Sequence, residues 1–219
     1  MLRSRFDEEL NKLSIDVNKM CHLVITAIED CVTAFKNQDK ELAKEIIAHD
    51  KIINDSERSV EARCLSLILK QQPIAGDLRT VSTALKIVTD LERIGDQSAD
   101  IVEILIELNG DCVYKMVEHI PNMASMAKKM VKEAIEAFNE QDLEKAGEVI
   151  LLDDKMDKYF GIVKHELSDI MKETVDKTDI CINFLMIAKY FERIGDHAVN
   201  ICEWVEFNQT GSVNDHRLL

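Results

Sequence analysis

The residues that could most readily do chemistry are acidic, and they lie in two copies of one motif. The pentapeptide Glu-Arg-Ile-Gly-Asp occupies positions 92–96 and again positions 192–196. In a helix, residues four apart lie on one face, so each copy places two carboxylates side by side at a small energetic cost. A mid-helix glycine costs about 1 kcal/mol more relative to alanine. Because both costs occur twice, the motif indicates a cation site between the carboxylates, in which glycine leaves room for the ion.

Further oxygen ligands are expected on the same helix faces and on a neighbouring helix. Asp50 and Asn54 are four residues apart, and their counterparts in the second copy are Asp153 and Asp157. The candidate metal ligands are Asp50, Asn54, Glu92, Asp96, Asp100, Asp153, Asp157, Glu192, Asp196 and Asn200. A site built only from oxygen atoms selects divalent or trivalent ions such as magnesium, calcium, manganese or iron.

Two other interpretations of these residues remain open. The acidic stripe could curve onto a solvated face, with the glycines allowing close helix packing and Arg93 and Arg193 reducing the repulsion between carboxylates. It could also belong to a di-iron oxidase of the ferritin type, but those bundles use Glu-x-x-His motifs and this sequence contains none. No phosphate-binding loop, dinucleotide fingerprint or nucleophile elbow is present. We therefore expect no catalytic residues.

The elements that must position these residues are long helices. Glycine occurs 7 times and proline twice, so the chain has few turn signals. Sandwiches, barrels and alternating strand–helix units need many more turns than this. Apolar residues recur at three- and four-residue spacing almost throughout the chain. This periodicity predicts helices over about residues 5–36, 39–70, 77–108, 121–138, 142–172 and 179–208.

The two halves of the chain repeat each other. Residues 85–96 match residues 185–196, and farther upstream residues 34–39 match residues 137–142. A pentapeptide identity with matched flanks indicates duplication of one structural unit. We therefore predict an all-α fold of two tandem three-helix bundles with six long antiparallel helices. The expected division is 1–109 and 110–219, at the helix-stop pair Asn109-Gly110.

Charge and hydropathy exclude several classes of function. The chain has 27 Lys and Arg against 41 Asp and Glu, a formal net charge of −14. Such a surface repels phosphate backbones, so we expect no direct binding of nucleic acid. No apolar stretch approaches the roughly 20 residues that span a bilayer, and no signal peptide is visible, which predicts a cytoplasmic protein without a transmembrane segment. The six cysteines show no metal-binding spacing and are expected as buried helix residues.

These motifs resemble those of one known family. The segment 71–79, Gln-Gln-Pro-Ile-Ala-Gly-Asp-Leu-Arg, together with the two Glu-Arg-Ile-Gly-Asp copies, closely resembles the PhoU family over essentially the whole chain. The resemblance implies two three-helix bundles, often in a homodimer, and E/DxxxD motifs that carry metal ions in multinuclear clusters. Here those motifs fall on Glu92, Asp96, Glu192 and Asp196. Asn54 and Asn200 stand where the other copy has acidic residues, and an amide binds cations more weakly than a carboxylate, so equal occupancy of the two sites does not follow from the resemblance.

The resemblance also implies a function. Members of this family act between the phosphate ABC transporter, including its ATPase subunit, and a phosphate-sensing histidine kinase, where they limit phosphate uptake and repress the starvation response. We therefore expect a regulatory adaptor and not an enzyme. Two alternatives from other classes are a metalloenzyme with oxygen ligands, such as a phosphatase or oxidase, and a purely structural helical interaction protein.

Overall fold

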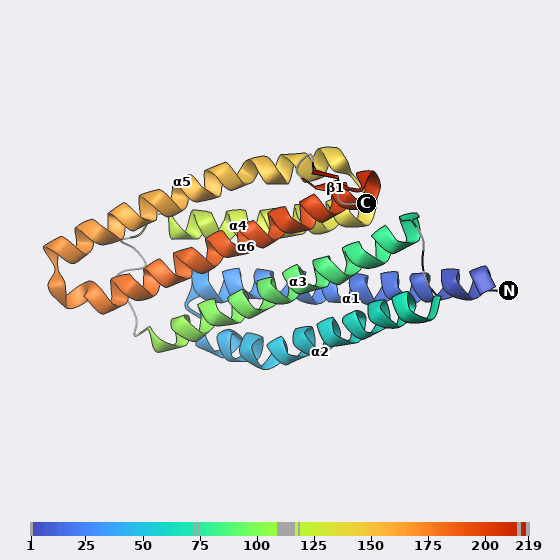
Figure 1. Cartoon of the computed structure of the whole chain (residues 1–219). Coiled ribbons are helices and arrows are strands. Elements are labelled where there is room, and N and C mark those ends of the chain that lie inside the picture. The colour runs from blue at the N-terminus through green and yellow to red at the C-terminus, as the bar shows by residue number, and fades with distance from the viewer. Residues whose placement is uncertain are drawn as a thin grey trace.

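Six long helices dominate the computed structural model of the chain (Figure 1). The structure describes residues 2–71, 73, 75–108, 117, 119–213 and 216–217. The elements are α1 (Leu2–Asn37), α2 (Lys40–Gln71), α3 (Ala75–Glu107), α4 (Ile120–Glu140), α5 (Leu143–Glu173), the 3-10 turn η1 (Val175–Lys177), α6 (Thr178–Thr210), β1 (Ser212–Val213) and β2 (His216–Arg217). The predicted all-α class is confirmed. After α6, two strands of two residues each, β1 and β2, form an antiparallel pair.

The helix boundaries follow the sequence signals to within a few residues. Pro121 lies in the first turn of α4, where its missing N–H removes no helical hydrogen bond. The last helix extends two residues beyond the expected end at Asn208, because Gly211 adopts a left-handed conformation with φ of 79° and ends the helix there. The expected division between the halves, at Asn109-Gly110, lies outside the described residues.

The same two-residue turn joins α1 to α2 and α4 to α5. Gln38 and Gln141 have φ of 56° and 54°, and each left-handed residue ends the preceding helix. The next residue then caps the following helix. Asp39 Oδ1 accepts hydrogen bonds from the backbone N–H groups of residues 41 and 42, and Asp142 Oδ1 accepts from those of residues 144 and 145. The duplication thus extends to backbone geometry.

The two central helices join the halves. α3 packs against α1 and α2, α6 packs against α4 and α5, and α3 and α6 pack against each other, running in opposite directions (Figure 1). Buried apolar residues from all six helices form one continuous core. Within it, Phe35 of α1 and Phe191 of α6 meet edge to face with ring centroids 5.7 Å apart. The two bundles therefore share a hydrophobic core.

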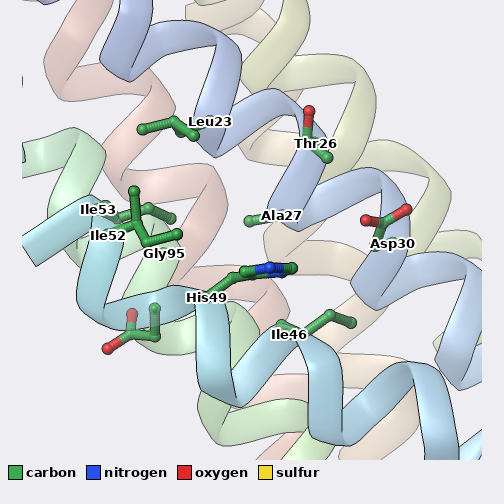
Figure 2. A pocket seen from close by; sticks show the side chains of 10 residues that line it. Leu23, Thr26, Ala27, Asp30, Ile46, His49, Ile52, Ile53 and Gly95 are labelled. Carbon is green, nitrogen blue, oxygen red and sulfur yellow. The ribbon is translucent and has the colours of Figure 1, made fainter.

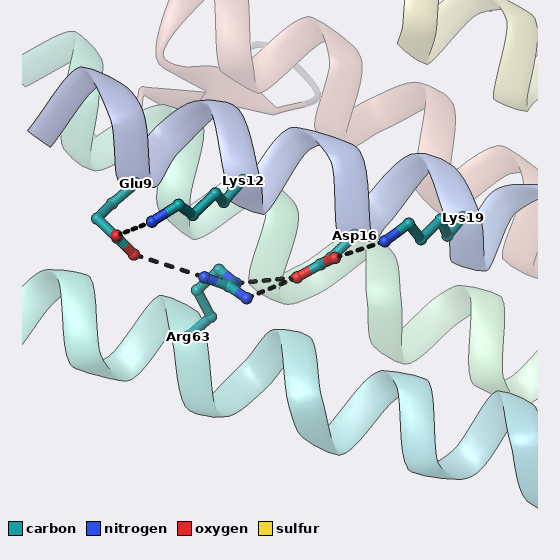
Figure 3. A network of polar contacts seen from close by, with 5 residues as sticks. All are labelled: Glu9, Lys12, Asp16, Lys19 and Arg63. Carbon is teal, nitrogen blue, oxygen red and sulfur yellow. Dashed lines mark hydrogen bonds and ion pairs between the residues drawn. The ribbon is translucent and has the colours of Figure 1, made fainter.

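A polar network connects α1 to α2 at the surface (Figure 3). Arg63 Nη2 lies 2.9 Å from Asp16 Oδ2, and Arg63 Nη1 lies 3.5 Å from Glu9 Oε2. Lys12 and Lys19 pair with the same two carboxylates from the α1 side. Exposed ion pairs contribute little stability individually, so this network adds modestly to the contact between the two helices.

Two further expectations from composition can be compared with the structure. Five described cysteines are buried and free, as expected, and Cys112 lies outside the described residues. Within the described part of the chain, no helix is long and apolar enough to cross a membrane.

Candidate metal centre

The two motif copies lie near the middle of α3 and α6, with one acidic side chain of each almost enclosed. The Glu92 side chain is 13% exposed and the Glu192 side chain is 11% exposed. Burying carboxylates in helices that also pack on a core is unfavourable unless hydrogen bonds, ion pairs or cations compensate. The hydrogen bonds, ion pairs or cations within reach of each carboxylate therefore decide what the site can do.

The glycines have a different role from the one expected. A Cβ atom on Gly95 would lie 2.9 Å from Ile53 Cδ1, and one on Gly195 would lie 3.4 Å from Met130 Cε. Their neighbours are therefore apolar side chains of adjacent helices, and the glycines allow close helix packing. The expectation that they leave room for an ion beside the carboxylates is wrong, because these side chains already pack against both glycine positions.

The first acidic cluster lies between α2 and α3. Asn54 Nδ2 donates a hydrogen bond of 2.8 Å to Asp50 Oδ2, which fixes the α2 side of the cluster. Burial raises the pKa of Asp50, the charge of Asp96 raises it further, and the hydrogen bond from Asn54 lowers it. Burial also raises the pKa of Glu92 to about 7, with added repulsion from Asp96 and Glu57. The predicted residues of α2 and α3 thus face one another.

Glu57 belongs to this cluster and was missed in the sequence. Its counterpart in the second half is Phe160, so Glu57 is not one of the duplicated acidic positions. Its spacing carried a signal, because Asp50, Asn54 and Glu57 follow the four-then-three spacing of one helix face. Burial raises the pKa of Glu57, and the charges of Glu61 and Asp96 contribute.

The second acidic cluster lies between α5 and α6 and contains a lysine. Burial raises the pKa of Asp153 to about 6, and the charges of Asp196, Asp157 and Glu192 act in the same direction. Lys189 Nζ forms an ion pair with Glu192 Oε2 and lies 5.3 Å from the centre of the Phe160 ring. In the first cluster the counterpart of Lys189 is Thr89, and the cation beside Glu92 is Arg93, whose Nε lies 3.3 Å from Glu92 Oε2. The two clusters are therefore related by the duplication but are compensated by different cations.

Several oxygen atoms in the clusters have no hydrogen-bond donor although they are buried. They are Asp50 Oδ1, Asn54 Oδ1 and Asp153 Oδ1, together with Glu92 Oε2, whose contact with Arg93 Nε is an ion pair without hydrogen-bond geometry. Buried oxygen atoms without donors are costly. A hard cation can satisfy them by coordination, in place of a hydrogen bond. The donor set therefore fits a cation with oxygen ligands; three of these oxygens lie in the first half and one, Asp153 Oδ1, in the second.

Asp100 and Asn200 lie in the contact between α3 and α6, although the charge of Asp100 still acts on Asp50. Asn200 Nδ2 donates a hydrogen bond of 3.0 Å to Asp90 Oδ1, and Asp100 accepts a hydrogen bond from Tyr190. His197 Nδ1 lies 2.8 Å from the same Asp90 oxygen. Both candidate ligands thus have a partner on the opposite central helix, which sequence spacing within one helix does not reveal.

The acidic groups are near one another but do not form a closed coordination shell. Within the described residues, no three His, Cys, Asp or Glu side chains converge closely enough to hold a metal ion as they stand. Carboxylates of like charge repel each other when no cation lies between them, which favours this open arrangement. Binding would require rotation of their side chains toward the ion.

Comparison with known proteins places this arrangement in a family. A model described as the PhoU domain matches residues 17–105 and again residues 120–205. The chain belongs to the PhoU family. The two matches start 103 residues apart (120 minus 17) and end 100 residues apart (205 minus 105). The repeated segments 34–39/137–142 and 85–96/185–196 show the same two offsets, so the internal duplication is confirmed.

Named relatives and solved structures agree with the family assignment. The chain is 39% identical over 216 residues to a phosphate-specific transport system accessory protein PhoU homolog of Clostridium acetobutylicum, covering 98% of this chain and 99% of that protein. It is 30% identical over 211 residues to the phosphate-specific transport system accessory protein PhoU of Escherichia coli, covering 96% of this chain and 87% of that protein. The crystal structure of PhoU from Pseudomonas aeruginosa superimposes with a TM-score of 0.88 at 31% identity, over 94% of this chain and 100% of that one. The Clostridium and Escherichia relatives are named as accessory proteins of a phosphate-specific transport system.

Proposed function

We propose that this protein is a metal-binding regulator of phosphate uptake and phosphate-starvation signalling. It acts as a cytoplasmic adaptor, in the form of a homodimer, between the phosphate ABC transporter with its ATPase subunit and a phosphate-sensing histidine kinase, and it is not an enzyme. The names of its relatives support a role in phosphate transport. The single observation that supports metal binding is the set of buried oxygen atoms without donors in α2, α3 and α5, of which Asp50 Oδ1 and Asp153 Oδ1 occupy duplicated positions.

The metal would be held by the residues of the two clusters. In the first half these are Asp50, Asn54, Glu92 and Asp96, and in the second half Asp153, Asp157, Glu192 and Asp196. A bound cation would supply positive charge that neutralises the facing carboxylates. The chain's own residues would hold α2 against α3, and α5 against α6, through shared ligands. The amide of Asn54 and the ion pair of Lys189 would make the two sites unequal.

Metal binding is tested by elemental analysis and thermal unfolding of protein purified without chelator. We expect bound iron, manganese, magnesium or calcium and a rise in melting temperature when the stripped protein is reloaded. The double variant Asp50→Asn/Asp153→Asn should lose most of this rise, since each substitution removes a carboxylate with an unsatisfied oxygen. Asp55→Asn, an exposed aspartate of α2, is the matched control and should keep it. Absence of bound metal together with no shift on reloading would refute this part of the proposal.

The regulatory role is tested separately in cells. Deleting the gene should raise phosphate uptake and starvation-gene expression when phosphate is abundant. Unchanged uptake and expression would refute the adaptor role, whatever the metal content. Turnover of a phosphoester or of dioxygen by the metal-loaded protein, lost in Asp96→Asn and Asp196→Asn, would instead favour a metalloenzyme. Light scattering in solution would test the homodimer.

A further inference from the structure

A pocket of about 230 Å³ lies between α1 and α2, beside the first acidic cluster (Figure 2). Its walls are apolar: Leu23 and Ala27 come from α1, Ile46 and Ile53 from α2, and Gly95 from α3. Ile52 also lines the pocket and is 49% exposed. Burying this apolar surface against a partner would be favourable in free energy. The pocket can therefore bury one bulky apolar group.

The second half of the chain fills the corresponding space with methionine. At the 103-residue offset the counterparts of Ala27 and Ile53 are Met130 and Met156. Both methionines reach within 3.5 Å of where a Cβ on Gly195 would lie. The small side chain of Ala27 leaves the space open in the first half, whereas Met130 and Met156 pack against Gly195 in the second. The pocket is thus a feature in which the two copies have diverged.

Negative charge flanks the pocket. Asp30 of α1 and Asp50 of α2 both line it, and His49 extends between the two helices (Figure 2). Among the described side chains, none forms a hydrogen bond or ion pair with Asp30, and Asp50 Oδ1 has no donor. Burial raises the pKa of Asp30, with Glu29 and Glu45 acting in the same direction and His49 against them. A basic group placed at the α1 side of the rim would be attracted by Asp30.

We propose that this pocket docks a segment of a partner protein that presents one bulky apolar side chain next to a lysine or arginine. The apolar walls accept the anchor side chain, and the adjacent basic group pairs with Asp30. Interfaces commonly derive most of their affinity from one such buried anchor surrounded by polar contacts. The proposal rests on the proposed adaptor function, because it supplies a contact surface that an adaptor requires.

Two capped dipeptides with the same anchor and opposite charge test the docking chemistry. In titrations of the full chain followed by amide NMR, acetyl-Phe-Arg-amide should shift the resonances of Ala27 and Gly95. Acetyl-Phe-Glu-amide should bind at least about tenfold more weakly, a difference of 1.4 kcal/mol. Equal binding of the two dipeptides, or shifts confined to other parts of the surface, would overturn the proposal.

Three variants of the chain locate the binding. Ala27→Met introduces the residue found at the counterpart position 130 and should abolish binding of acetyl-Phe-Arg-amide. Ala48→Met makes the same change at an exposed position of α2 outside the pocket and should leave binding unchanged. Asp30→Asn should weaken the binding of acetyl-Phe-Arg-amide but not the binding of acetyl-Phe-Glu-amide. This comparison keeps the test decisive even if Ala27→Met fails to fold.

Cells carrying these variants separate the docking proposal from the proposed function. If gene deletion derepresses phosphate uptake, Ala27→Met should derepress it too, and Ala48→Met should not. Full repression by a folded Ala27→Met protein would overturn the docking proposal and leave the adaptor role intact. A deletion without effect would refute the adaptor role, and the dipeptide titrations would still decide the chemistry of the pocket. Loss of a dimer in Ala27→Met would assign the pocket to a second copy of this chain and overturn the proposal.

Discussion

Asp90 of α3 and Asn200 of α6 are joined by a hydrogen bond of 3.0 Å from Asn200 Nδ2 to Asp90 Oδ1. At the 100-residue offset their counterparts are Tyr190 and Asp100, which are also hydrogen-bonded to each other across the same helix pair. The two copies have thus kept a polar pair at equivalent positions while changing its chemistry. In each pair one partner is a carboxylate and the other a donor, so the contact between the bundles has one specific alignment.

Replacing the donor of this pair by a carboxylate should destabilise the protein. Asn200→Asp removes the hydrogen bond to Asp90, which is only 8% exposed, and places a second negative charge beside it. We expect a loss of about 1–3 kcal/mol in the free energy of unfolding, measured with urea. The exchange variant Asp90→Asn/Asn200→Asp restores one donor and one acceptor and should recover at least half of that loss. No recovery would mean that the pair does not couple the helices.

Metal-free protein should lose stability as the pH rises through the titration of Glu92. The folded pKa is raised to about 7 from the ordinary 4.5, so the folded state retains a proton that the unfolded state has released. Stability therefore falls between about pH 4.5 and pH 7 and is constant above that range. Glu92→Gln removes this loss, because its amide carries no charge at any pH.

The measurement is urea unfolding of both proteins in chelator at several pH values. Above pH 7 we expect Glu92→Gln to be more stable by on the order of 1–2 kcal/mol, allowing for screening by water. Below pH 4.5 the difference should vanish. A difference that grows as the pH falls would contradict the assignment. With metal restored, the same variant should gain less stability than the unmodified protein, since a ligand oxygen has become an amide.

The two duplicated caps should contribute equally. Asp39→Ala and Asp142→Ala each remove a carboxylate that accepts hydrogen bonds of 3.0 or 3.1 Å from two backbone N–H groups. Each should lower the free energy of unfolding by about 1 kcal/mol, and the double variant by the sum, since they act on separate helices. Asp39→Asn and Asp142→Asn keep an accepting oxygen and serve as controls. A strongly unequal effect would show that the turns differ in spite of their shared geometry.

Much of the fold was predictable because its signals are local. The helix ends depend on residues such as Asp39, Asp142 and Pro121, whose effects act within one turn, and the repeat then specified two equivalent units. The membership of the acidic site was less predictable. Helical spacing showed which residues share a face, but the pairing of Asn200 with Asp90, and of Tyr190 with Asp100, depends on which helix packs opposite. A single sequence does not show which face each helix turns toward its neighbours.

The two motif glycines should respond to substitution in opposite ways. A Cβ on Gly95 would lie 2.9 Å from Ile53 Cδ1 and 3.1 Å from Ile53 Cγ2, and Ile53 is buried. Gly95→Ala should therefore cost about 1–3 kcal/mol through overpacking. A Cβ on Gly195 would meet nothing closer than 3.4 Å, at the flexible end of Met130. Gly195→Ala should be neutral or stabilising by up to about 1 kcal/mol, because alanine favours the helix.

A second substitution separates overpacking from other causes. Ile53→Val removes Cδ1, the atom closest to the added methyl group, and by itself should cost about 0.5–1.5 kcal/mol. In the double variant, adding Gly95→Ala to this background should cost at least 1 kcal/mol less than in the unmodified chain. Urea unfolding of the four proteins gives the coupling energy directly. A coupling near zero would show that the backbone of α3, and not the contact with Ile53, requires glycine at position 95.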